Sequence, residues 1–202
     1  MPNNATIRKI VSQRLSHHRM QHTLGVEMTA IQLARLYGVD EEKVCTAALL
    51  HDYAKQLPSD RLLAKAQAYG LEIGDFERAH PDLLHGPVAA KMAEEEFAIH
   101  DPDILEAITY HTTGKVGMGT LAQIIYLADS IEPHRKFPEA DELRRLSLNR
   151  LPEALYQCAR HTMIYLAQRN IPQHPATQEV LTWFKQLQEK EQNDDGTSEK
   201  DC

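Results

Sequence analysis

Apolar residues recur at intervals of three and four along almost the whole chain, the spacing of the buried face of an α-helix. The single Asp195-Gly196 pair lies in a polar stretch near the end, so it does not predict a hairpin between alternating runs. We therefore expect an all-α protein. The predicted helices lie near residues 6–17, 20–37, 40–54, 59–69, 86–98, 101–110, 119–131, 139–148, 151–169 and 176–191.

The breaks between these helices have ordinary chemical causes. Gly38 is placed to close the second helix and Asp40 to cap the third. Pro58 is expected to end the third helix and Ser59 to cap the fourth, while Pro102 suits the first turn of another. None of these breaks has the composition of a linker. We predict one helical domain.

Composition fits this prediction. The chain has 202 residues, of which 42% are hydrophobic and 25% charged, which is typical of a globular protein with a buried core. Of the net charge of −7, residues 189–202 supply −4, so the body carries only −3 and lacks the basic surface that nucleic acid requires. We expect the domain to span residues 1–192, and residues 193–202 to form an acidic, disordered tail.

The expected location is the cytoplasm. No apolar run approaches the ~18 residues that cross a bilayer, and the first ten residues contain no apolar signal segment. Cys45, Cys158 and Cys202 are far apart, so reduced thiols are expected rather than disulfides or a thiolate metal site. A membrane partner is not expected.

His51 and Asp52 follow the apolar run that ends at Leu50, where the hydrophobic core is expected. Residues three and four apart share a helix face, so both polar side chains point toward apolar neighbours. A buried carboxylate without a partner is too costly to leave uncompensated. Asp52 therefore needs a cation, a metal ion or a proton beside it.

The same kind of position recurs four times elsewhere. Asp129 and His111 each lie on the same helix face as the apolar residues that precede them. His85 begins a helix and shares a face with the apolar residues that follow it, and His22 precedes a turn of small residues. A single histidine on an apolar face is usually a satisfied core residue. Several histidines and aspartates together are better explained by joint coordination of metal.

Six candidate ligands without sulfur suit two ions better than one. Six ligands on one octahedral ion would leave no position for water or substrate, whereas two ions ~3.5–4 Å apart, bridged by a carboxylate and a hydroxide, leave positions open. Asp52 is the natural bridge because it lies beside His51 and has two oxygens. Iron, manganese, cobalt and zinc all suit nitrogen and oxygen ligands. The ligand set alone does not choose among these metals.

The pattern His22, His51-Asp52 and Asp129 resembles the signature of the HD-domain superfamily of metal-dependent phosphohydrolases, and His85 with His111 resembles its two-metal subset. Longer blocks resemble the YqeK-type family of bacterial symmetrical diadenosine tetraphosphate hydrolases. The blocks are Arg19 to His22, Leu50 to Lys55, His85-Gly86, Tyr110 to Gly114 and Ala128 to Arg135. The likeness extends over about residues 6–170. It implies a single HD-domain helical bundle that cleaves diadenosine tetraphosphate into two ADP.

The resemblance also implies individual roles. His22, His51, Asp52 and Asp129 would hold one ion, and Asp52, His85 and His111 the second, with a metal-bridging hydroxide attacking phosphorus. Lys55, one turn beyond Asp52, would contact a phosphoryl oxygen or assist the leaving group. The other expected substrate contacts are Arg19, Thr112, Thr113, Gly114 and Arg135, with pairing to a metal-bound carboxylate as the alternative role of Arg19. Glu132 is expected to be a structural hydrogen-bond partner rather than an acid.

Other functions stay open at this point. A nucleotide phosphohydrolase of different specificity, a non-catalytic nucleotide sensor and a helical bundle with a structural metal all use the same ligands. Sole production of ADP from diadenosine tetraphosphate would distinguish the first function from these. The sequence leaves the preferred phosphate-chain length, the base and the oligomeric state open, a homodimer included.

Overall fold

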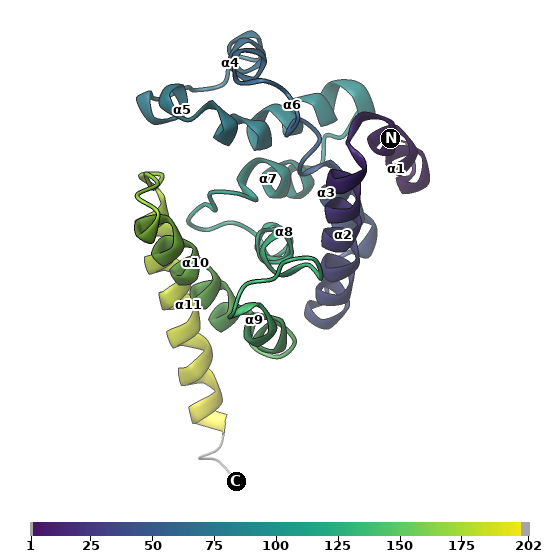
Figure 1. Ribbon diagram of the computed structural model, residues 1–202. Coiled ribbons are helices and arrows are strands. Elements are labelled where there is room, and N and C mark those ends of the chain that lie inside the picture. Colours follow the sequence, from purple (N-terminus) through teal and green to yellow (C-terminus); the bar gives the residue numbers. More distant parts are fainter. Residues whose placement is uncertain (1, 199–202) are drawn as a thin grey trace.

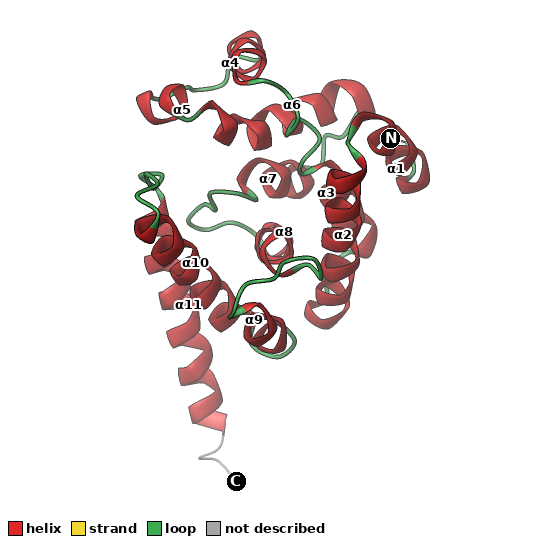
Figure 2. Ribbon diagram, viewed as in Figure 1, coloured by secondary structure: helices red, strands yellow, loops and turns green. Residues whose placement is uncertain are grey.

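The computed structural model describes residues 2–198, with side chains described as far as residue 193. Within this part of the chain every regular element is helical (Figures 1 and 2), which confirms the all-α prediction. The helices are α1 (Asn4–Arg14), α2 (His17–Tyr37), α3 (Glu41–Leu50), α4 (Ser59–Ala68), α5 (Asp75–Ala79), the 3-10 helix η1 (Pro81–Leu84), α6 (His85–Phe97), α7 (Pro102–Tyr110), α8 (Thr120–Ile131), α9 (Ala140–Ser147), α10 (Leu151–Gln168) and α11 (Thr177–Ser198).

Helix α8 runs through the middle of the molecule (Figure 1). It is apolar on most of its circumference, from Leu121 to Ala128, as expected for a helix that is covered on several sides. It packs against α2, α3 and α7 on one side and against α9 and α10 on the other. Its C-terminal end therefore lies where two groups of helices meet.

Helices α2 and α3 form an antiparallel pair beside α8. Gly38 ends α2 in the left-handed conformation, with φ of 67°, and the Asp40 side chain accepts hydrogen bonds from the first N–H groups of α3. Both expectations for this turn are confirmed. The other helix pair, α10 and α11, packs along its length and sends Phe184 into the core, where its ring centroid lies 5.5 Å from that of Tyr126.

Several helix ends differ from the predictions. Helix α3 ends at Leu50, and residues 51–57 form successive tight turns instead of continuing the helix to residue 54. Ser59 is the first residue of α4 and its side chain makes no capping hydrogen bond, so its predicted role as a cap is wrong. Helix α6 begins at His85, one residue earlier than predicted.

Two short helices were not predicted. Helix α5 has five residues and η1 has four, too few for a periodic apolar pattern to identify them. Helix α11 extends to Ser198, beyond residue 191, so the beginning of the predicted acidic tail is helical. The rest of that tail, residues 199–202, lies outside the described residues, as does Cys202.

Buried apolar side chains from α1 to α11 form one continuous core cluster, which favours the predicted single domain. Cys45 and Cys158 are free thiols inside this core. In the described part of the chain, every helix is too short or too polar to cross a membrane.

Candidate metal centre

The six residues that sequence analysis selected as ligands come from separate segments and lie together. His22 projects from the middle of α2 and Asp129 from the last turn of α8. His51 and Asp52 follow the end of α3, His85 opens α6, and His111 follows the end of α7. The structure therefore brings all six residues into one cluster, in which the Asp129 side chain is the most exposed, at 20%.

Helix ends orient three of the histidines. Nδ1 of His51 lies 2.6 Å from the carbonyl oxygen of Ala48, and Nδ1 of His111 lies 2.8 Å from that of Ile108. His85 makes the equivalent contact with the carbonyl oxygen of Asp82. A carbonyl only accepts, so each Nδ1 carries the proton and donates, which leaves Nε2 with a free lone pair. These histidines are thus prepared to bind metal through Nε2.

His22 is oriented by a carboxylate instead. Its Nδ1 lies 3.2 Å from Oε1 of Glu132, which follows the end of α8. The other oxygen of Glu132 accepts from the backbone N–H of His134 at 2.7 Å. A Cβ atom at Gly25 would collide with this carboxylate, so the glycine makes room for it. Glu132 is therefore a positioning residue for His22, as the expected structural role implied.

The Asp52 carboxylate lies between two pairs of histidines. Its Oδ2 is 3.9 Å from Nε2 of His22 and 3.8 Å from Nε2 of His51. Its Oδ1 is 3.3 Å from Nε2 of His85 and 3.7 Å from Nε2 of His111. Each oxygen thus faces its own pair of imidazoles, which is the arrangement a bridging carboxylate requires.

Two overlapping triplets have ligand atoms within 4.8 Å of one another. One consists of His22, His51 and Asp129, and the other of His51, Asp52 and His111. His85 adjoins the second triplet, since its Nε2 is 2.9 Å from Nε2 of His111. The predicted division of ligands assigned His51 to one ion only, whereas the geometry places it next to both groups.

Buried nitrogen atoms indicate that the cluster is built for a cation. Nε2 of His22 and Nε2 of His51 are buried without a hydrogen-bond partner. The nearest carboxylate to the first, Asp129 Oδ1, is 3.0 Å away but outside hydrogen-bonding geometry. A metal ion would satisfy both lone pairs. The donor set of imidazoles and carboxylates, without thiolates, fits such an ion.

Burial and charge act differently on the four histidines. Burial lowers the pKa of His22, but its contacts with Asp129 and Glu132 outweigh burial and raise it. Burial lowers the pKa of His51 to about 4 and also lowers the pKa of His85. Burial opposes the low pKa of Asp52, but the surrounding imidazoles of His51, His111 and His85 outweigh burial and hold this pKa well below its usual range. At neutral pH His51 and His85 are therefore neutral imidazoles and Asp52 is an ionised carboxylate, the forms that bind metal.

Two arginines lie against the carboxylates of the cluster. Nη1 of Arg19 is 2.9 Å from Oδ2 of Asp52, and Nη2 of Arg135 is 2.8 Å from Oδ1 of Asp129. Nε of Arg135 also donates to the backbone carbonyl of Asp129. Arg135 was expected to bind phosphate, and Arg19 either to bind phosphate or to pair with a carboxylate of the cluster. Here both guanidinium groups neutralise the two aspartates while remaining partly exposed.

The remaining predicted contacts divide into two groups. Nζ of Lys55 lies 3.3 Å from Nε2 of His85, and the hydroxyl of Thr112 lies at the same distance from that atom. Thr113 and Gly114 are occupied locally: the Thr113 hydroxyl donates to the carbonyl of Gly114, and the N–H of Gly114 donates to Tyr110. Lys55 and Thr112 therefore border the cluster, and the other two shape the adjoining turn.

Fold and site together define a helical protein with a sulfur-free His/Asp cluster that fits a divalent metal ion. Comparison with known proteins agrees: the family model "HD domain" matches residues 19–134. The chain belongs to the HD-domain family, in its YqeK-type branch.

Curated relatives and a crystal structure support this placement. The chain is 42% identical to "Bis(5'-nucleosyl)-tetraphosphatase, symmetrical" of Bacillus subtilis over 86% of its length and 93% of the relative. It is 33% identical to the protein of the same name from Staphylococcus aureus, over 93% and 97% of the two chains. It also resembles the crystal structure of a "predicted HD superfamily hydrolase involved in NAD metabolism" from Clostridium acetobutylicum. That resemblance has a TM-score of 0.89, 35% identity and coverage of 93% and 99%.

Proposed function

We propose that this protein is a metal-dependent hydrolase that cleaves diadenosine tetraphosphate symmetrically into two molecules of ADP. The observation that carries the proposal is the Asp52 carboxylate, whose two oxygens each face a different pair of buried imidazoles. The names of the relatives from Bacillus subtilis and Staphylococcus aureus support the same reaction. The substrate is a small dinucleoside polyphosphate, and the product is ADP.

We propose two metal ions per chain, held by the six residues of the cluster. Asp52 would serve both ions, with His22 and Asp129 on one side and His85 and His111 on the other. His51 adjoins both groups. Bound ions supply Lewis-acid stabilisation of the phosphoryl oxygens and lower the pKa of water. Iron is the metal we expect, with manganese, cobalt and zinc as alternatives that suit the same ligands.

The surrounding side chains bind and orient the substrate in this proposal. Lys55 and Thr112 border the His85 side of the cluster, where the ammonium and the hydroxyl can each contact a phosphoryl oxygen. Arg19 and Arg135 border the opposite side, and guanidinium groups pair well with phosphate. Thr113 and Gly114 contribute through the shape of the turn that presents Thr112.

Product analysis tests the reaction directly. We expect the metal-loaded protein to convert diadenosine tetraphosphate to ADP as the sole nucleotide product. Ion-exchange chromatography of the reaction mixture identifies the products. Production of ATP and AMP, or the absence of turnover, would contradict the proposal. Tight ADP binding without turnover would favour a nucleotide sensor.

A variant of the bridging carboxylate tests the role of the cluster. Asp52→Asn should lose both bound metal and turnover, because the neutral amide cannot bridge two cations. Asp60→Asn, at an exposed position in the first turn of α4, is the matched control and should retain both. Elemental analysis of protein purified without added metal measures which ion is bound and how many. Cytoplasmic location and a homodimer remain predictions from the sequence.

A further inference from the structure

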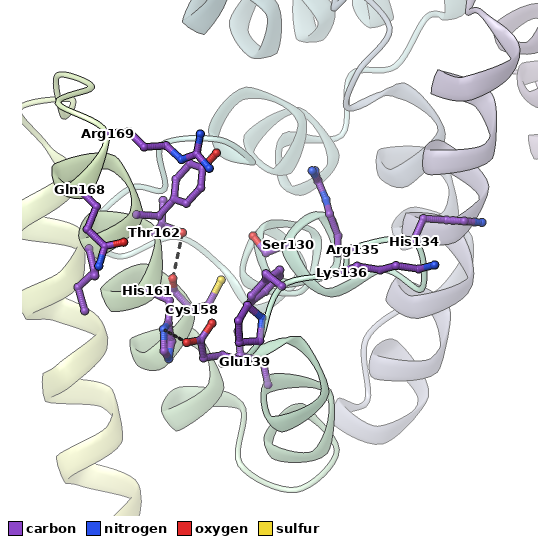
Figure 3. A pocket seen from close by; sticks show the side chains of 15 residues that line it. Ser130, His134, Arg135, Lys136, Glu139, Cys158, His161, Thr162, Gln168 and Arg169 are labelled. Carbon is purple, nitrogen blue, oxygen red and sulfur yellow. Dashed lines mark hydrogen bonds and ion pairs between the residues drawn. The ribbon is translucent and has the colours of Figure 1, made fainter.

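A cavity of about 930 Å³ lies between α10 and the segment 132–139 that follows α8. Figure 3 shows it from close by, with Ser130 and Arg135 on one side and Thr162, Gln168 and Arg169 on the other. Pockets that hold small ligands have volumes of about 300–1,000 Å³. The cavity is therefore large enough for a nucleoside together with its first phosphates.

This cavity adjoins the metal centre directly. Arg135 lines the cavity and also pairs with Asp129 at 2.8 Å, and Ser130 follows Asp129 in the chain. A ligand that reaches from the cluster past Asp129 therefore enters this space. Lys136 adds a second cationic side chain to the same wall. The wall next to the cluster is thus suited to phosphate.

The opposite wall is suited to a flat ring. Tyr165 lies on α10, lines the cavity and is 51% exposed, so a ligand in the cavity can reach it. The guanidinium of Arg169 lies 4.5 Å from the centre of the Tyr165 ring. Gln168, on the turn between them, offers an amide that can donate and accept hydrogen bonds. Aromatic and guanidinium planes together provide a stacking surface for a base.

We propose that this cavity binds one nucleoside of the dinucleotide substrate, with the Tyr165 ring and the Arg169 guanidinium stacking on its base. The inference rests on the proposed function, since a symmetrical substrate extends in two directions from the centre. Arg135 and Lys136 then contact the phosphates between the base and the metal ions. Tyr165 and Arg169 determine affinity for nucleotides over phosphate alone, a role that nothing in the His/Asp motif specifies.

The test separates binding of the base from binding of the phosphates. Affinity for ADP and for methylenediphosphonate, a diphosphate mimic without base or ribose, is measured by calorimetry on manganese-loaded protein. Tyr165→Ala should weaken ADP binding on the order of tenfold and leave binding of the mimic unchanged, because only the stacking surface is lost. Tyr165→Phe retains the ring and should bind ADP as the unchanged protein does.

Ile171→Ala is the matched control, because Ile171 is also an exposed apolar residue near the end of α10 but lies outside the cavity. It should leave both affinities unchanged. Equal ADP affinity in Tyr165→Ala and the unchanged protein would overturn the proposal, and so would equal weakening of both ligands. In turnover, Tyr165→Ala should raise KM for diadenosine tetraphosphate with little change in kcat.

The outcome is distinguishable from failure of the proposed function. A protein that yields ADP from the dinucleotide but shows no ADP-selective loss in Tyr165→Ala refutes the cavity assignment alone. A protein that shows the selective loss but does not cleave the dinucleotide refutes the reaction and supports a nucleoside site.

Discussion

Single residues decide how well the cluster can hold a cation. Nδ1 of His22 lies against a carboxylate, that of Glu132, whereas Nδ1 of His51, His85 and His111 lies against backbone carbonyls. A carboxylate behind an imidazole fixes the ring and raises its basicity as a ligand. The space for that carboxylate exists only because position 25 is glycine.

Glu132→Gln should weaken metal binding by about 10- to 100-fold, because the amide holds His22 less firmly and removes the negative charge behind it. Calorimetric titration with manganese measures the change in affinity for the metal. Glu142→Gln, at an exposed position of α9, is the control and should bind metal as before. Equal affinities for the two variants would show that Glu132 does not position the ligand.

Gly25→Ala should weaken metal binding although alanine is the better helix former, by about 1 kcal/mol in a helix interior. The added methyl group collides with Glu132 and displaces it from His22. The same manganese titration, with thermal unfolding alongside, checks both effects. Gly119→Ala, where a Cβ meets nothing closer than 3.5 Å, is the comparison. Undiminished affinity in Gly25→Ala would mean that the carboxylate can move without consequence.

At the scale of elements, the ends of helices do most of the positioning. His51 and His111 occupy the capping positions of α3 and α7, and His85 is the first residue of α6. The apolar spacing predicted which faces these residues share, but it placed His51 and Asp52 inside a helix that ends at Leu50. Periodicity identifies a helix face well and its last turn poorly, because turns of residues 51–57 continue the same apolar pattern.

Helix α7 gives a prediction about stability and pH. The Asp101 side chain caps α7 and pairs with Lys43 of α3 at 2.8 Å, and the Lys43 hydrogen bond lowers the pKa of this carboxyl below its usual 3.8. Because the folded pKa is the lower one, the stabilisation is present above the unfolded value and is lost as pH falls through the folded value. Asp101→Ala should cost about 1 kcal/mol at pH 7 through the lost cap.

Asp101→Asn separates the charge from the cap. Asparagine also caps helices, so this variant should be less stable than the unchanged protein at pH 7 only by the loss of the Lys43 pair. The difference should shrink as pH falls below about 4, where the carboxyl becomes protonated first in the unfolded chain, and vanish below the lower pKa of the folded state. Urea unfolding at pH 7 and at pH 3 measures this, and a difference that does not depend on pH would refute the charge contribution.

At the scale of the whole molecule, the cluster joins helices that already share a core. Apolar side chains from α2, α3, α7 and α8 pack around it independently of any ligand. Arg19 and Arg135 neutralise the two aspartates, so the carboxylates have partners before metal binds. The centre is therefore expected to add stability to a formed fold instead of creating the fold.

Metal removal tests this expectation. Chelation should lower the melting temperature by roughly 5–10 °C, because an ion at about 100 times its Kd contributes about 2.7 kcal/mol. The helical circular dichroism signal at 25 °C should be retained. Complete loss of helical signal on chelation would instead indicate a structural metal bundle, the reading that the sequence alone left open.

The sequence by itself determined the helical architecture and selected the six candidate ligands. Both can be recognised from nearby sequence. Apolar spacing defines the helix faces, and a histidine or aspartate on such a face stands out from its apolar neighbours. The tertiary structure decided what depends on distant parts of the chain. It placed Glu132 behind His22, set the arginines against the aspartates, and formed a cavity between α10 and the segment after α8. Those contacts join residues far apart in sequence, and no periodic pattern encodes which distant side chains will meet.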